Sequence, residues 1–344
     1  MVGGMLPLHT PRLTVRMMRG HDIALLVDYR NDPAIGTFQD WELPFTEAAA
    51  QRLIDGQAAL DGPTDGEWVQ LAVQLAATGE VVGDIAVQLS GGGAFATLGY
   101  TFAAEHHGRG YATEAASAVV DALCAMGVHR FVATLDPENV PSMRVLEAVG
   151  FTFECIARQA ADVRGEWVDD LRYSMLAADR RAWRDRLRTR PAEIQLVPLD
   201  DELVDSFLGV STHHSQQRFV RPIVLALSQM AFPIFRDDGR QFVPEAFGIT
   251  ADGVAAGFVQ LANCSFLHDE PYLWRLLVDR WHQRRGIGRE VLHLIAQRTR
   301  AAGHSTLVVS YGEGPGSPGP LYRSFGFVPT GEISEGETVA RLVL

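Results

Sequence analysis

The stretches QRRGIGREV (residues 283–291) and HGRGYATEA (residues 107–115) read alike, and they decide the fold. Each follows a run of residues typical of a strand and opens an amphipathic helix. The first turn of a helix has unpaired backbone N–H groups and the positive end of the helix dipole, and glycine lets this backbone approach an anion closely. The two stretches therefore predict two phosphate-binding turns of one design.

The same spacing continues downstream of both turns. Gly110 is followed by Gly150 in VLEAVGFTF, and Gly286 is followed by Gly326 in LYRSFGFVP, so that both glycines recur at an offset of 176 residues. A chance match of one glycine-rich turn does not place a second motif in register. We interpret the pattern as a duplication.

Each half of the chain carries the same predicted order of elements. A chain of 344 residues fits two domains of ordinary size, and the charged segment that ends at Pro191 separates them. We therefore predict domains at residues 1–187 and 188–344. In each, three strands, the glycine-rich turn, a helix, a strand, a helix and a last strand follow in order. This order indicates an α/β fold, a mixed α+β sheet with helices packed on it.

Composition excludes several classes of protein. The net charge of −12 disfavours nucleic-acid binding, which needs clustered Lys and Arg. No apolar run reaches the roughly 18 residues of a membrane span, and the N-terminus lacks a signal-peptide pattern, so we expect a cytoplasmic protein without membrane contact. The three cysteines lie far apart, and side chains of adjacent histidines do not converge on one ion, so we expect no metal site.

Neither turn ends in Gly-Lys-Ser/Thr or reads G-x-G-x-x-G, which argues against a kinase-type loop and a dinucleotide fingerprint. QRRGIG instead resembles the Q/R-x-x-G-x-G/A signature of the GNAT superfamily of N-acetyltransferases. HGRGYATEA resembles its variant in the Rim-type branch, which acetylates protein N-termini. The resemblance covers nearly the whole chain and implies acetyl-CoA in each half, with pyrophosphate on the turn and pantetheine along residues 100–103 or 276–279. The tandem layout also resembles GNAT proteins of antibiotic gene clusters, such as that for clavulanic acid.

The resemblance implies a set of cofactor-binding residues in both halves. Arg109, Arg284 and Arg285 would add positive charge beside the diphosphate. Whether the second site takes acetyl-CoA or another acyl-CoA stays open. The predicted residues are Phe102, Ala103, His107, Gly108, Arg109, Gly110, Tyr111, Ala112, Thr113, Asn139 and Ser142 in the first half, and Leu277, Val278, Gln283, Arg284, Arg285, Gly286, Ile287 and Gly288 in the second.

Acetyl transfer from a thioester requires a proton for the departing thiolate, and a tyrosine hydroxyl is a suitable donor. Tyr322, four residues before Gly326, matches the general-acid tyrosine of the GNAT pattern. The equivalent position in the first half is Leu146, which has no proton to give. There, Asn139 and Ser142 resemble the N-x-x-S of the Rim-type branch, which makes Ser142 a candidate catalytic donor. Helix capping explains the same two residues equally well.

The acceptor amine must also lose a proton, since an alkylammonium group has a pKa of about 10.4. Glu245 and Asp279 are candidates for the general base by position, and neither is assigned. The stretch GEGPGSPGP (residues 312–320) cannot form regular helix or strand, so we predict a rigid irregular loop beside the second site.

These observations favour an acetyl-CoA-dependent N-acetyltransferase that acts on a primary amine of a small molecule, natural product or peptide. The C-terminal half is the predicted catalytic domain. Two alternatives stay open: a peptide or protein N-terminal acetyltransferase that uses the first half, and a non-catalytic acyl-CoA-binding regulatory protein. The sequence names neither the acceptor nor the oligomeric state.

Overall fold

The computed structural model describes residues 5–39, 41–200, 202–232 and 234–344, and the chain forms two compact units, residues 1–185 and 186–344. Each unit is a mixed sheet with helices on both faces. Among the described residues, no helix is both long and apolar enough to cross a membrane.

The first unit is built on a sheet with the strand order β1-β2-β3-β4-β5-β6-β8-β7. Its neighbours are antiparallel except for the parallel pair β5 and β6. The strands are β1 (Leu8–His9), β2 (Leu13–Met17), β3 (Trp68–Leu75), β4 (Val81–Ser90), β5 (Phe95–Phe102), β6 (Arg130–Leu135), β7 (Thr152–Val163) and β8 (Glu166–Leu176). The helices are α1 (Ile23–Arg30), α2 (Pro33–Gly36), α3 (Glu47–Gly56), α4 (Tyr111–Ala125), α5 (Val140–Val149) and α6 (Ala177–Asp185), with 3₁₀ turns η1 (Gly20–Asp22) and η2 (Ala104–His106).

The second unit repeats this plan with the strand order β14-β15-β13-β12-β11-β10-β9. Here β12 and β13 form the parallel pair. The strands are β9 (Ile194–Pro198), β10 (Pro244–Ala251), β11 (Val254–Ala262), β12 (Tyr272–Val278), β13 (Thr306–Tyr311), β14 (Val328–Ser334) and β15 (Glu337–Val343). The helices are α7 (Val204–Leu208), α8 (Ile223–Ala231), α9 (Ile287–Ala301) and α10 (Gly319–Phe325), with a 3₁₀ turn η3 (His214–Gln216). The predicted mixed α/β sheet in each half is confirmed.

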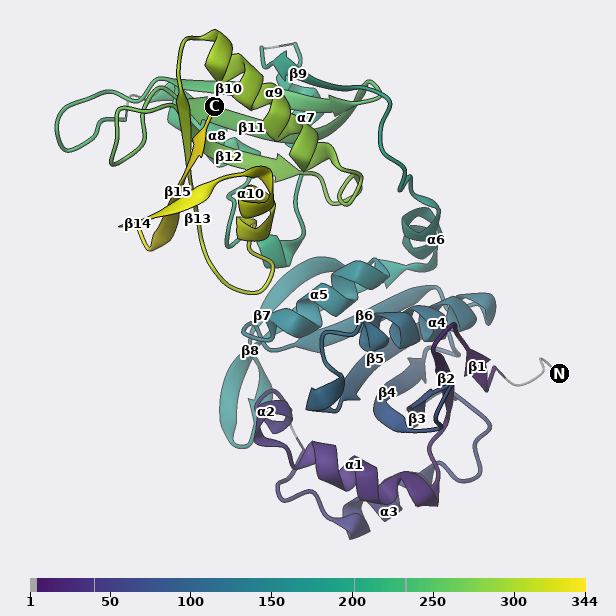
Figure 1. Ribbon diagram of the computed structural model, residues 1–344. Helices are drawn as coiled ribbons and strands as arrows, with labels where there is room; N and C mark the ends of the chain where they lie inside the picture. The colour runs from purple at the N-terminus through teal and green to yellow at the C-terminus, as the bar shows by residue number, and fades with distance from the viewer. Residues whose placement is uncertain (1–4, 40, 201, 233) are drawn as a thin grey trace. The chain divides into compact units, whose positions relative to one another are not determined.

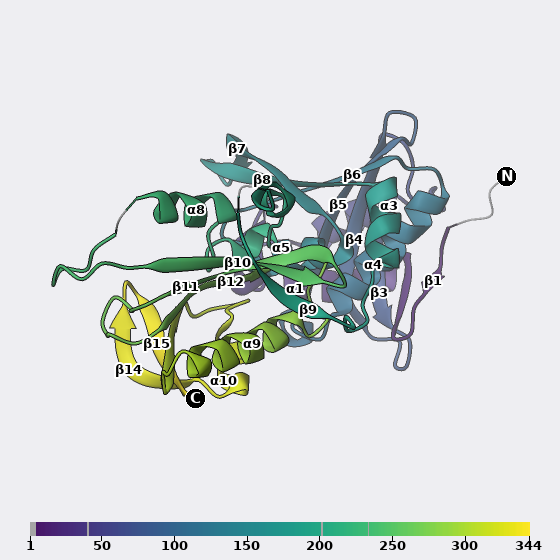
Figure 2. The same cartoon turned by 90° about the horizontal axis from the view of Figure 1, so that it is seen from above.

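The helices divide between the two faces of each sheet. In the first unit α4 and α5 pack on one face, and α1 and α3 pack on the other (Figure 1). In the second unit α9 and α10 cover one face of β10–β12 and α8 covers the opposite face (Figure 2). The helices α4 and α9 follow the two glycine-rich turns, have 15 residues each, and bury one apolar stripe against their sheets. The duplication seen in the sequence is therefore a duplication of structure.

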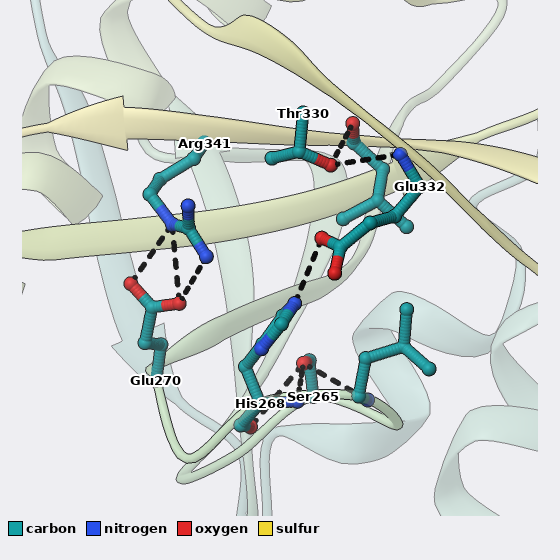
Figure 3. A network of polar contacts seen from close by, with 8 residues as sticks. Ser265, His268, Glu270, Thr330, Glu332 and Arg341 are labelled. Carbon is teal, nitrogen blue, oxygen red and sulfur yellow. Dashed lines mark hydrogen bonds and ion pairs between the residues drawn. The ribbon is translucent and has the colours of Figure 1, made fainter.

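A polar network fixes the segment before β12 to the β14–β15 hairpin (Figure 3). The guanidinium of Arg341 donates to both carboxylate oxygens of Glu270, with Nη2 2.7 Å from Oε2. Nε2 of His268 lies 2.8 Å from Oε2 of Glu332, and the backbone N–H of His268 donates to Oγ of Ser265 at 2.8 Å. These contacts hold the start of β12 against β14 and β15.

Replacing Arg341 by glutamine is expected to lower the free energy of unfolding of the second unit by about 1 kcal/mol at pH 7. Burial alone would raise the pKa of Glu270, but the Arg341 guanidinium holds it below its ordinary value of 4.5. A carboxyl group with a depressed pKa in the folded state stabilises the fold above its unfolded pKa, and this stabilisation is lost as the pH falls through the folded pKa. In urea unfolding, the difference between variant and wild type should therefore shrink below about pH 4.

The ion pair of Arg298 with Glu245 offers a matched control, because its side chains are 50% and 53% exposed. Arg298→Gln should change the free energy of unfolding by less than about 0.5 kcal/mol, since exposed pairs are screened by solvent. A deficit of Arg341→Gln that stays constant from pH 7 to pH 3 would show that the ion pair is not its cause.

Candidate functional site

The two glycine-rich turns have the same backbone conformation. In the first unit Gly108 and Gly110 have φ values of 72° and 79°, and in the second Arg284 and Gly286 have 63° and 81°. Gly110 is the N-cap of α4 and Gly286 the N-cap of α9, and neither helix receives a hydrogen bond from a side-chain cap. The N–H groups of both first turns are therefore left for an external anion, which fits the diphosphate of a coenzyme A.

The first residue of each turn ties the turn to the end of the preceding strand. Nε2 of His107 lies 2.8 Å from the carbonyl oxygen of Phe102. In the second unit Nε2 of Gln283 donates to the carbonyl oxygen of Val278 at 3.0 Å. Both contacts span five residues and occur at the same offset in the two units. His107 and Gln283 thus fix each turn to the strand that precedes it.

In each unit, an arginine from outside the glycine-rich turn neutralises the charge of a carboxylate in the first turn of the helix that follows. Nε of Arg12 donates to Oε2 of Glu114 at 2.6 Å, and Nη1 of Arg12 donates to the carbonyl oxygen of Arg109 at 2.9 Å. In the second unit Nη2 of Arg190 lies 2.8 Å from Oε2 of Glu290. A bare carboxylate there would repel a diphosphate, so these pairs favour an anion at both turns. The two arginines carry no sequence signal, because each lies about a hundred residues from its partner.

The predicted cations differ in their surroundings. Arg285 is 4% exposed: its Nε donates to the carbonyl oxygen of Thr189 at 2.8 Å, and its Nη1 lies 2.8 Å from Nδ1 of His282. These partners turn Arg285 inward as a support of the loop. Arg109 and Arg284 are exposed on the turns. The proposed charged contact with the diphosphate therefore rests on these two residues.

The first helical turns contain the remaining predicted residues of the signature. Ile287 belongs to the core, and a Cβ added to Gly288 would come within 3.3 Å of the Leu321 side chain. In the first unit Tyr111 packs against the core and lies beneath the Arg12 guanidinium, 4.7 Å from its ring centroid. Ala112 and Thr113 follow it in the first turn of α4. These side chains shape the turn, and its backbone is the part offered to a ligand.

The parallel strands separate next to each turn. β5 pairs with β6 only from Phe95 to Thr97, although β5 continues to Phe102 and stays paired with β4. β12 pairs with β13 only at Tyr272 and Leu273, and β12 continues to Val278 along β11. Past these points no strand in the described part of the chain pairs with that edge of β5 or of β12. Such an edge suits the amide groups of an extended pantetheine.

Only the second of these strands carries a bulge. The register between β11 and β12 shifts between Gln260 and Leu261, which leaves Trp274 without a partner, whereas β4 and β5 pair without a shift. A bulge frees a backbone N–H where the strands separate. The buried side chains of Phe102, Ala103 and Leu277 pack in the cores, so the predicted strand residues offer backbone groups.

Tyr322 lies on α10 and is 5% exposed, with its ring 5.6 Å from those of Tyr311 and Phe327. Burial raises the pKa of its hydroxyl, and the nearby Tyr272 and Glu337 raise it further. A phenol that keeps its proton at neutral pH is suited to donate it to a thiolate. The Tyr322 ring lies beside that of Tyr311, the last residue of β13.

The corresponding helix of the first unit is arranged differently. Leu146 is a core residue, and Oδ1 of Asn139 accepts the backbone N–H of Ser142 at 3.1 Å as the cap of α5. The hydroxyl of Tyr100 on β5 lies 2.8 Å from Oγ of Ser142, and burial raises the pKa of this phenol. Asn139 thus has a capping contact, while Ser142 meets a tyrosine that the sequence reasoning did not assign.

The two candidates for a base are occupied by other contacts. Oε2 of Glu245 pairs with the exposed Arg298 at 3.0 Å. Asp279 accepts the backbone N–H groups of Ser211 and Trp281, both at 2.9 Å. These contacts explain both carboxylates as supports of the fold. Residues 312–318 form neither helix nor strand, as predicted. The prediction is wrong for Gly319 and Pro320, which open α10, because proline is tolerated in the first turn of a helix.

Two family models match the chain. The model described as an acetyltransferase (GNAT) domain matches residues 12–152, and that of the acetyltransferase (GNAT) family matches residues 196–327. Among curated proteins, the uncharacterized N-acetyltransferase p20 of Bacillus licheniformis is 28% identical over 171 residues, which is 49% of this chain and 95% of p20. The probable N-acetyltransferase YjcK of Bacillus subtilis is 41% identical over 85 residues, 24% of this chain and 47% of YjcK.

Solved structures of similar proteins include a GNAT-family acetyltransferase from Bacillus anthracis, 25% identical, with a TM-score of 0.46, covering 50% of this chain and 99% of that one. RimJ of Mycobacterium smegmatis, solved in complex with CoA-disulfide, is 27% identical with a TM-score of 0.43, covering 51% of this chain and 91% of RimJ. The two family models together account for most of the sequence, one in each unit. The chain is therefore an acetyltransferase of the GNAT family, with two family domains in tandem.

Proposed function

We propose that the protein transfers an acetyl group from acetyl-CoA to a primary amine of a small molecule, natural product or peptide. The supporting observation is the pair of uncapped helices that begin at Gly110 and Gly286, each beside a strand that has separated from its parallel neighbour. In this proposal both units bind acyl-CoA. The thioester supplies an activated carbonyl carbon to the amine.

The proposal assigns turnover to the second unit. Tyr322 supplies the proton that the thiolate needs, and a backbone N–H near the Trp274 bulge polarises the thioester carbonyl. The first unit lacks both features: Leu146 stands where the tyrosine would be, and the β4–β5 ladder has no bulge. Its acyl-CoA then serves mainly to stabilise the unit. The proposed setting is the cytoplasm, and the resemblance suggests antibiotic biosynthesis as the pathway class.

A second candidate function places chemistry in the first unit as a peptide N-terminal acetyltransferase. The contact between the Tyr100 hydroxyl and Oγ of Ser142 favours it, because it joins two hydroxyl groups close to where β5 leaves β6. In this alternative Ser142 donates the proton to the thiolate, and the Tyr100 hydroxyl is the hydrogen-bond partner of Ser142.

The test is thiol release from acetyl-CoA with a panel of small amines and short peptides, using the full chain. The proposed function predicts amine-dependent release that survives Ser142→Ala and is lost with Tyr322→Phe. The alternative predicts the reverse, with peptides preferred. Acetyl-CoA binding without amine-dependent release from the wild type would contradict both and indicate a regulatory binding protein.

A further inference from the structure

A chain of three polar side chains crosses the second unit on the face opposite α9 and α10. The hydroxyl of Tyr272 on β12 lies 2.7 Å from Oγ of Ser310 on β13. Oγ of Ser310 in turn donates to Oε2 of Glu337 on β15 at 2.5 Å. Tyr272 shares its core cluster with Val308 and Phe242, which places the chain on the side of the sheet covered by α8.

The direction of these hydrogen bonds is fixed by proton count. An ionised carboxylate only accepts, and a serine hydroxyl has a single proton to donate. Because Ser310 gives that proton to Glu337, Tyr272 must donate to Ser310. All three groups are therefore aligned to pass protons from Tyr272 toward Glu337. Glu337 is only half-buried, so a proton that arrives there can leave to solvent.

The tyrosine end of this chain lies where the strands separate. Tyr272 is paired with Val308, yet its hydroxyl reaches Ser310, which lies one residue past the last paired residue, Val309. Tyr322 lies on the other face of the same sheet, where its ring is 5.6 Å from that of Tyr311, the residue after Ser310. The chain and the predicted acid therefore flank the end of β13 from opposite faces of the sheet.

We propose that Tyr272, Ser310 and Glu337 form the proton relay that deprotonates the acceptor ammonium in the second unit, an inference that rests on the proposed function of that unit. The ammonium gives a proton to the Tyr272 oxygen, Tyr272 gives its own to Ser310, and Ser310 gives its own to Glu337. The freed lone pair forms the C–N bond with the thioester carbon and the C–S bond breaks. The thiolate takes a proton from Tyr322, which regains one from the nitrogen as the amide forms.

The surrounding charges fit this role. Burial raises the pKa of Tyr272 to about 12, and the Glu337 and Glu335 carboxylates add to this, while Ser310 and Arg275 oppose it. Tyr272 is thus a neutral phenol whose oxygen can accept one proton while its hydroxyl donates another. Arg275 is held by Gln260 and packs against the Trp274 ring, and Arg221 lies near it. The network of Figure 3 anchors the segment before Tyr272 to the hairpin that carries Glu337, so the relay is held in place.

The test is the pH profile of kcat/KM for Glu337→Gln in the full chain, with acetyl-CoA and the alkylamine that the wild type turns over fastest. Loss of the relay should lower kcat/KM by roughly 10²-fold at pH 7. The variant must then draw on free amine, so its rate should rise about tenfold per pH unit toward the pKa of the amine, near 10.4. The wild type should be flat between pH 7 and pH 9. Ser310→Ala should reproduce the profile of Glu337→Gln.

Glu335→Gln is the matched control, because it removes a carboxylate from the same hairpin that lies outside the hydrogen-bonded chain. It should keep the wild-type profile and a rate within about twofold. Profiles of Glu337→Gln and Ser310→Ala that run parallel to the wild type, with acetyl-CoA affinity retained, would overturn the relay. Failure of the wild type itself to turn over any amine would instead refute the proposed function and the relay with it.

Discussion

Gly286→Val is expected to abolish amine-dependent thiol release, whereas Gly110→Val should leave most of it. Gly286 has a φ of 81°, and no other atom lies within 4 Å of a Cβ added there, so the new side chain would project into the space in front of the first turn of α9. That space is where a diphosphate would meet the backbone N–H groups. We expect kcat/KM to fall by roughly 10³-fold or more, as binding and alignment are lost together.

Backbone strain must be separated from the loss of the site, because a valine at positive φ costs about 1–2 kcal/mol wherever it is placed. Gly303 is a matched control: its φ is 89°, no atom lies within 4 Å of an added Cβ, and it follows the C-terminal end of the same helix. Gly303→Val should lose similar stability and keep its turnover. Equal losses for Gly110→Val and Gly286→Val in steady-state assays would contradict the division of labour between the units.

Tyr322→Phe is expected to lower kcat by roughly 10²- to 10³-fold with the affinity for acetyl-CoA unchanged. The ring is packed between Tyr311 and Phe327, and phenylalanine keeps that packing while it removes the proton for the thiolate. Because burial raises the pKa of Tyr322 above its ordinary value of 10.0, the wild type should show no loss of activity between pH 7 and pH 9 from this group.

Tyr311→Phe is the control for this substitution, since the hydroxyl of Tyr311 accepts a hydrogen bond from Nη1 of Arg323 at 3.1 Å on the same aromatic stack. It should keep kcat within a few fold. Steady-state kinetics and acetyl-CoA titration separate the two effects. An unchanged kcat for Tyr322→Phe would remove the tyrosine from the chemistry.

The fold of both halves could be predicted from the sequence, because the duplication is visible in the equal spacing of the glycine motifs. The offset between Gly110 and Gly286 matches that between the first residues of α4 and α9, and the mixed sheet of each half is confirmed. A turn that requires a left-handed backbone conformation favours glycine, and the positions of glycines can be seen directly in the sequence. Arg284 shows the limit, since a non-glycine residue adopts the left-handed conformation there.

Side-chain partners distant in sequence were not predictable. Arg12 and Arg190 lie outside every motif, and only the fold brings them to Glu114 and Glu290. The sequence pattern predicts Arg285 as a phosphate cation, but its partners are Thr189 and Asp252, which lies in the turn between β10 and β11. Pairings of this kind depend on tertiary geometry, which periodicity and propensity do not encode.

The central claim is that each of the two glycine-rich turns binds one acetyl-CoA. Native mass spectrometry of the full chain with acetyl-CoA tests this most directly, together with Gly110→Val, Gly286→Val and the double variant. The assignment predicts two bound molecules in the wild type, one in each single variant and none in the double variant. Binding that persists in the double variant, or a wild type that takes up none, would contradict it.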